Sequence, residues 1–172
     1  MLVEFGRWPC VVLAICGGLV AVAAQAVELS ATDMRFIKSA EAALSPAIVM
    51  SQMAPPRTSN VAVKTYAASV VDDYHKADLE MLALSDIDPA SALVDPAVEK
   101  ERQGLTALAD HAFERRYLTA MVKYHQQAMG LFQKQLSSLN NARLKELVEV
   151  TLARLSTHLD QAKSLLTARP PS

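Results

Sequence analysis

Apolar residues recur every three to four positions along four long segments of this chain, residues 32–54, 60–84, 110–138 and 141–167. That spacing places the apolar side chains on one face of an α-helix and the polar ones on the other. We therefore predict four long helices that bury their apolar faces together. The predicted inward positions include Phe36, Ile37, Leu44 and Ile48 in the first segment, Val63, Tyr66, Val70 and Tyr74 in the second, Phe113, Tyr117, Met121 and His125 in the third, and Leu144, Val148, Leu155 and His158 in the fourth.

A shorter helix is predicted over residues 96–108, between the second and third long segments. Asp95 is its expected cap and Pro96 its first residue. Pro46 is expected to kink or interrupt the first long helix. The turns near residues 56–59 and 139–141 are short, so each should join an antiparallel pair of helices. The pattern predicts an all-α protein, an up-down four-helix bundle with a short extra helix between helices 2 and 3.

The first 26 residues have the pattern of a secretory signal peptide. Arg7 precedes an apolar run, and Ala-Gln-Ala at positions 24–26 is a cleavage site of the small-x-small type. We predict export to the periplasm of a Gram-negative-type cell and one mature domain over residues 27–172. Lipidation at Cys16 is the alternative to cleavage after Ala26.

The composition of the predicted mature chain narrows its partners. Both cysteines lie in the leader, so the fold must hold without disulfides. The formal net charge is −1 with no basic stripe, which argues against nucleic-acid binding. After the leader no apolar run is long enough to span a membrane. Oligomerisation stays open, and the composition names no partner.

Two histidines, His125 and His158, lie on apolar faces of the last two long helices. A buried imidazole needs a hydrogen bond, a metal or a proton to exchange. If both turns lie at one end of the bundle, helix rise places His125, His158, His75 and Glu41 at roughly one level. The sequence therefore predicts an interior cluster of these four side chains.

This predicted cluster is open to several kinds of chemistry. Imidazole and carboxylate donors suit zinc, iron or copper(II). Met121 and Met129 flank His125 by one turn on each side, and their thioethers would suit copper(I) as weaker ligands. The alternatives are core histidines that hydrogen-bond to Tyr74, Tyr117 or Tyr124, and a proton-linked role.

Several stretches of the chain resemble the bacterial family called domain of unknown function 4142. They are residues 33–37, 63–67, 71–77, 113–125 and 152–162, and their order and spacing carry the resemblance. The resemblance implies an exported, ferritin-like helical bundle, often labelled an outer membrane protein, with no settled activity. His125 and His158 match histidines of the family pattern.

The chain also departs from the family pattern at two helices. The family usually shows Asp-His in helix 2, where this chain has Asp73 and Tyr74, with His75 one position later. One residue turns a helix by about 100°, so His75 is displaced from the family direction. The later part of helix 1 often carries a glutamate in the family, and this chain has Ala47 there. The Glu-x-x-His motifs of a ferritin two-metal centre are absent from the sequence.

The sequence therefore favours an exported binding or stress-linked structural module with an interior histidine cluster. The alternative is a copper- or iron-binding protein that uses His125 and His158 with Met121 and Met129, or with Glu41 and His75. An enzyme is less favoured, because the sequence has neither a recognisable nucleophile–base pair nor a cofactor motif.

Overall fold

Five helices make up the regular structure of a computed structural model, which describes residues 28–85 and 95–168. The described residues contain no strand, which confirms the predicted all-α class. The predicted signal peptide and the polar stretch before Asp95 lie largely outside the described residues. The helices are α1 (Ala31–Gln52), α2 (Val61–Leu82), α3 (Pro96–Thr106), α4 (Asp110–Leu136) and α5 (Ala142–Thr167).

Short polar side chains start four of these helices, and one of them, Asp95, is the predicted cap. Ser30 and Asp33 form a capping box at the start of α1. Asn60 caps α2 and Asn141 caps α5, each through a side-chain oxygen that accepts from backbone N–H groups. Asp95 caps α3 ahead of Pro96 in the same way. Helix α1 continues through Pro46 without interruption.

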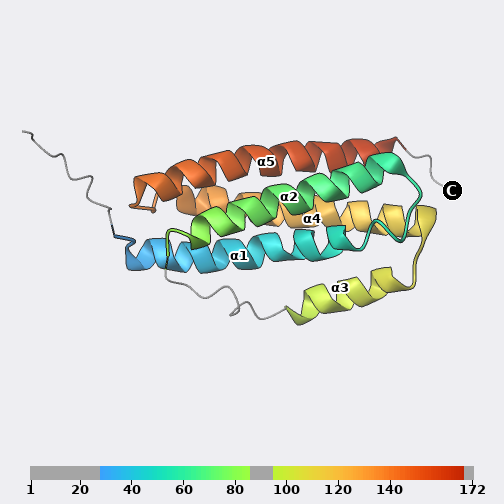
Figure 1. Cartoon of the computed structure of the whole chain (residues 1–172), viewed down its shortest axis with the longest axis horizontal. Helices are drawn as coiled ribbons and strands as arrows, with labels where there is room; N and C mark the ends of the chain where they lie inside the picture. The colour runs from blue at the N-terminus through green and yellow to red at the C-terminus, as the bar shows by residue number, and fades with distance from the viewer. Residues whose placement is uncertain (1–27, 86–94, 169–172) are drawn as a thin grey trace, which may run out of the picture.

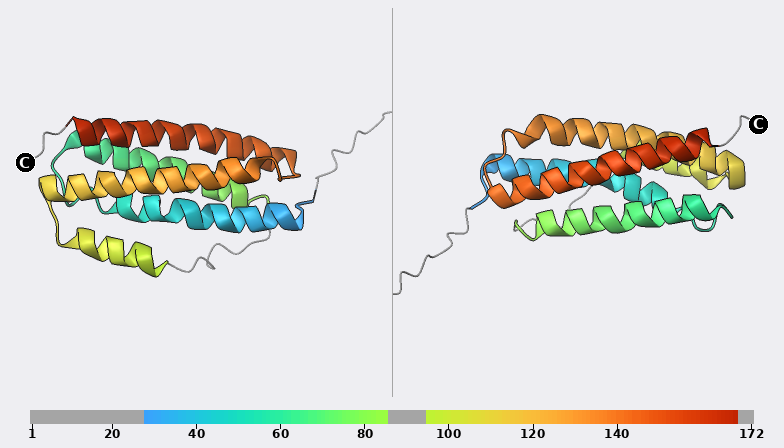
Figure 2. Two further views of the ribbon diagram at one scale, coloured as in Figure 1. Left: turned by 180° about the vertical axis from the view of Figure 1, so that it is seen from behind. Right: turned by 90° about the horizontal axis from the view of Figure 1, so that it is seen from above.

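The four long helices lie side by side, and each packs against two of the others (Figure 1). Helices α1 and α2 form one hairpin and α4 and α5 the other, and α1 lies on α4 while α2 lies on α5. Helix α3 lies outside this group, against α1 and α4, as the two further views confirm (Figure 2). Within the described residues, no helix is long and apolar enough to cross a membrane.

The two hairpin turns lie at opposite ends of the four long helices, so the predicted up-down order, in which both turns share one end, is wrong. The α4–α5 turn meets the start of α1, where the Asn140 N–H donates to Asp33 Oδ1 at 2.8 Å. The α1–α2 turn meets the start of α4, where Thr58 hydrogen-bonds to Glu114. Helices α2 and α4 consequently run in the same direction, and α3, which lies between them in sequence, is on the outside (Figure 1).

Aromatic and aliphatic side chains fill the space between the long helices. Phe36 and Phe132 meet edge to face with ring centroids 5.2 Å apart, and the rings of Phe113 and Tyr117 stack. Burial of one such ring stabilises the fold by about 1.5–3 kcal/mol. This apolar packing surrounds the polar side chains that form the candidate site.

Candidate functional site

His125 lies in the middle of α4 with no exposed surface. Its Nδ1 is 2.6 Å from the backbone oxygen of Met121, one turn earlier. Because a carbonyl oxygen only accepts, Nδ1 carries the proton and donates it to this bond. In the neutral ring Nε2 then has a lone pair, and it finds no hydrogen-bond partner among the described residues.

The His125 ring is neutral at physiological pH. Burial lowers the pKa of its imidazole to about 4, and the neighbouring His158 adds to this effect. The hydrogen bond to the Met121 carbonyl opposes the shift without cancelling it. Since the charged form is disfavoured, His125 presents Nε2 to the interior as an acceptor or as a ligand atom.

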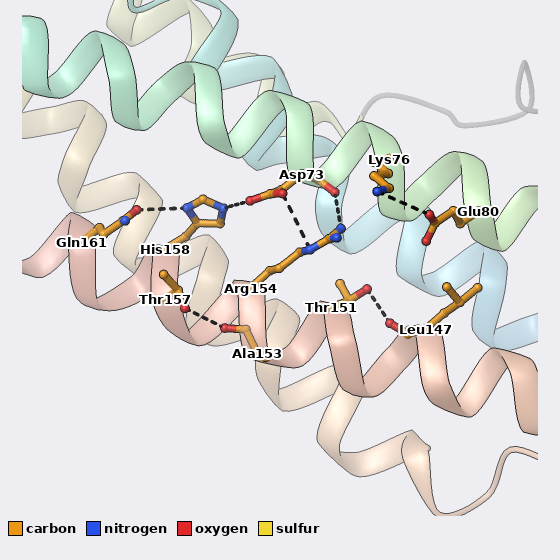
Figure 3. Close-up of polar contacts among 10 residues, drawn as sticks. All are labelled: Asp73, Lys76, Glu80, Leu147, Thr151, Ala153, Arg154, Thr157, His158 and Gln161. Atoms are coloured by element: carbon orange, nitrogen blue, oxygen red, sulfur yellow. Dashed lines mark hydrogen bonds and ion pairs between the residues drawn. The ribbon is translucent and has the colours of Figure 1, made fainter.

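His158 on α5 is also buried, but both of its nitrogens have polar partners. Its Nε2 is 2.9 Å from Asp73 Oδ2 on α2, and its Nδ1 is 3.2 Å from the side-chain oxygen of Gln161. Asp73 also faces Arg154, whose Nε lies 3.7 Å from the second carboxylate oxygen (Figure 3). A carboxylate on one nitrogen of a histidine orients the ring, as in the outer shell of many metal sites.

Four rings from three helices surround one another in the bundle interior. The His125 and His158 centroids are 6.0 Å apart in an edge-to-face arrangement. Tyr74 lies 5.6 Å from His125 and 5.5 Å from His158, and Tyr66 lies 6.4 Å and 6.0 Å from them. The two tyrosines come from α2 and the histidines from α4 and α5.

The hydroxyl groups of Tyr66 and Tyr74 are buried, and neither has a hydrogen-bond partner in the described part of the chain. Burial raises the pKa of both phenols, so both are neutral donors. We call Tyr66 Oη, Tyr74 Oη and His125 Nε2 the interior polar triad. In contrast, the hydroxyl of the nearby Tyr117 is 2.8 Å from Ser51 Oγ.

A surface groove between α2 and α5 leads toward this region. One part, of about 340 Å³, is lined by Ser69, Asp73, Arg154 and His158, among others. A second part, of about 440 Å³, is lined by Tyr66 and by α5 residues that include Gln161. Ser69 and Gln161 belong to both parts. His158 and Tyr66 therefore connect the buried rings with the surface.

The structure brings together two of the four side chains predicted for the cluster. His75 is exposed on α2, and its place toward the interior is taken by Tyr74. Glu41 lies near Asp78 on α2, where burial and the Asp78 charge raise the pKa of its carboxyl group. His75 is at the level of the histidine pair but on the exposed side of α2, and Glu41 lies beside Asp78 and outside the ring cluster.

The two methionines have different surroundings. Met121 is fully buried, and its sulfur is 3.9 Å from Ser51 Oγ on α1. Met129 is partly buried at the edge of the core. None of the predicted tyrosine partners hydrogen-bonds to a histidine among the described residues, although Tyr74 contacts both rings.

Tyr66 takes part in the site in a way that the inward pattern alone did not predict. Tyr66 was expected only as a core residue, yet its hydroxyl is one of three unsatisfied polar atoms in the cluster. The sequence feature that could have indicated this role is Tyr74, a second tyrosine two turns later on the same buried face of α2. Asp73 precedes an inward residue, and it reaches the edge of α5 from there.

No group of three or more His, Cys, Asp or Glu side chains in residues 28–85 and 95–168 is placed to hold a metal ion. The ligand set of His125, His158, His75 and Glu41 is therefore not assembled. Any three-ligand site at His125 must include other donors, and the rings in contact with it are those of Tyr66, Tyr74 and His158.

Fold and site define an all-helical protein with a buried pair of imidazoles. The chain belongs to the family described as Domain of unknown function (DUF4142), whose model matches residues 19–165. No curated protein matches the chain. A similar fold is found in the crystal structure of a DUF305 fragment from Deinococcus radiodurans, with a TM-score of 0.73 and 16% identity over 82% of this chain and 99% of that one.

Proposed function

We propose that this protein is an exported four-helix-bundle binding module of the ferritin-like type, with its ligand site in the interior around His125 and His158. The observation that carries the proposal is the interior polar triad, three buried polar atoms without a hydrogen-bond partner among the described residues. A ligand that satisfies these atoms would bind to the folded chain and stabilise it.

The free energy of folding favours this interpretation over a purely structural one. Each buried polar group without a partner costs about 1–3 kcal/mol. Leucine or phenylalanine at these positions would fill similar space without that cost. Three such groups on neighbouring rings therefore lower the stability of a core that serves only packing. A polar ligand could hydrogen-bond to them or be coordinated by them.

Export is the second part of the proposal. It rests on the signal-peptide pattern of residues 1–26, which lie outside the described residues. The mass of the mature protein from periplasm should correspond to a chain that begins at Val27.

A metal-binding function, with copper or iron, is the second candidate. The unprotonated Nε2 of His125 favours it, because a neutral imidazole nitrogen is a common ligand for transition metals. The hydrogen bond from His158 to Asp73 is of the kind that supports metal-ligating histidines.

Native mass spectrometry of the protein purified from periplasm tests the binding function. The native mass should exceed the mass of the denatured chain by that of a bound ligand or ion. The excess should be lost in His125→Leu and kept in His75→Ala, the control at an exposed histidine. The proposal is overturned if the wild type carries no additional mass and neither copper, iron nor zinc raises its melting temperature.

A further inference from the structure

We infer that a groove between α3 and α4 binds a single-chain amphiphile with a carboxylate head, such as a fatty acid. Helix α3 lies outside the four long helices, and the groove follows the face of α4 beside it (Figure 2). Its volume of about 490 Å³ is within the range of small-molecule sites. No residue of the interior polar triad lines this groove, so the site goes beyond the proposed function.

Small and apolar side chains form the floor of the groove. Helix α4 contributes Ala112, Ala120 and Tyr124, and Leu108 follows the end of α3. Ala120 and Tyr124 are buried, and Leu108 is partly buried. Between positions 112 and 124 the helix rises by about 18 Å. An elongated apolar ligand therefore matches this floor better than a compact one.

Three cationic side chains of α4, Arg115, Arg116 and Lys123, line the same groove. They face a single carboxylate, that of Glu101. The groove is therefore positively charged, although the chain as a whole has a formal net charge of −1. An anionic head group complements this local charge, whereas a cationic one would be repelled.

Arg116 is held at the groove before any ligand arrives. Its Nε donates to Glu101 Oε1 at 3.0 Å, and its guanidinium lies against Gly104, where a Cβ atom would be 3.2 Å from Nη2. A guanidinium has five N–H donors, so the bond to Glu101 leaves others for a carboxylate. A side chain that is already positioned loses less entropy when it binds a ligand.

Lys123 adds a second cation on the same face of α4, seven residues after Arg116. Its Nζ lies 5.6 Å from the centroid of the Tyr124 ring. The methylene groups of a lysine can cover apolar surface while the ammonium group stays in water. Ala120 lies between the two cations, so an alkyl chain that lies on it would have a cation within reach at each end.

The shape of the site favours a free molecule over a membrane surface. A protein that lies on a bilayer inserts exposed apolar side chains from a convex face. Here the apolar side chains Leu108, Ala120 and Tyr124 are recessed between two helices and are buried or partly buried. A single chain can enter such a recess, whereas a bilayer cannot follow it.

Calorimetric titration with laurate, at concentrations below micelle formation, tests the inference. The wild type should bind one laurate per chain. Dodecyltrimethylammonium has the same tail and the opposite charge, and butyrate has the same head without the long tail. Each of them should bind at least about tenfold more weakly than laurate. Laurate binding should also weaken as salt is added, because salt screens exposed charges.

A double variant, Arg116→Gln with Lys123→Gln, should weaken laurate binding by about fivefold or more. The matched control is Arg143→Gln with Lys163→Gln, which removes two exposed cations of α5 and should leave the affinity unchanged. Both double variants should fold, because ion pairs at the surface contribute little to stability.

Equal affinity of the wild type for laurate and for the cationic amphiphile would overturn the inference. Equal laurate affinity of the Arg116 and Lys123 double variant and the wild type would overturn it too. Binding to vesicles of an anionic phospholipid without binding to laurate would mean that the partner is a membrane. Because the interior polar triad lies outside the groove, the absence of an interior ligand would contradict the proposed function and leave the groove site intact.

Discussion

His125 and His158 are both buried imidazoles, yet their chemical positions differ. His158 has polar partners on both nitrogens, and one of them is a carboxylate at the groove. His125 donates from Nδ1 to its own helix and leaves Nε2 to the interior. The His158 ring is therefore held in place by its two partners, whereas His125 has a free nitrogen that can bind a ligand. The sequence pattern, which is the same for both residues, did not reveal this difference.

Acid should destabilise the protein through His125. The pKa of this ring is about 4 in the folded chain against 6.5 as the ordinary value, so the unfolded chain binds more protons between these pH values. Stability should therefore fall as the pH is lowered from 6.5 to 4, by about 3 kcal/mol. Urea unfolding at a series of pH values measures this loss.

The variant His125→Leu serves as the control for this pH dependence. It retains His158 and all acidic groups, so the difference between the two proteins isolates His125. Parallel stability curves for the wild type and His125→Leu across this pH range would show that His125 is not a neutral buried ring.

Helix α2 shows how a change of one position moves a functional group. Tyr74 occupies the inward position and His75, one residue later, is exposed. Each residue turns the helix by about 100°, which here takes the side chain at position 75 from the interior to the surface. The α2 contribution to the interior is therefore two phenols, Tyr66 and Tyr74, and no imidazole.

Asp73 joins α2 to α5 through the side chains of His158 and Arg154. Its removal leaves the buried His158 without its carboxylate partner, so Asp73→Ala should lower the free energy of unfolding by about 1–2 kcal/mol. The expected loss of unfolding free energy is no larger because Asp73 is partly exposed and solvent weakens its interactions. Chemical unfolding of the variant measures the change.

Asp72→Ala is the matched control for Asp73→Ala, because Asp72 is the exposed neighbour on the same helix. It should change stability by less than about 0.5 kcal/mol. Equal losses in the two variants would mean that the bond from His158 to Asp73 contributes nothing to the α2–α5 contact.

Local features of the helices were predictable from sequence, because they depend on neighbours in the chain. Ser30, Asn60, Asp95 and Asn141 are at helix starts, and the apolar period placed His125 and His158 inward. The interruption expected at Pro46 is absent, since α1 continues through this residue.

The relative direction of the two hairpins was not predictable from sequence. The segment between α2 and α4 is long enough to return along the outside, so its length does not decide at which end α4 begins. The contacts of Asn140 with Asp33 and of Thr58 with Glu114 show which ends meet in the structure.

At the scale of the whole molecule, the four long helices enclose the interior polar triad, although packing of their apolar faces does not require buried polar atoms. Nitrogen NMR of the His125 ring, in protein from periplasm and again after unfolding and refolding with a chelator, shows whether anything occupies that interior. We predict that Nδ1 stays protonated in both samples and that the Nε2 signal differs between them, because Nε2 holds the ligand only in the first. Identical spectra, with a free and unprotonated Nε2 in both samples, would contradict an interior binding site.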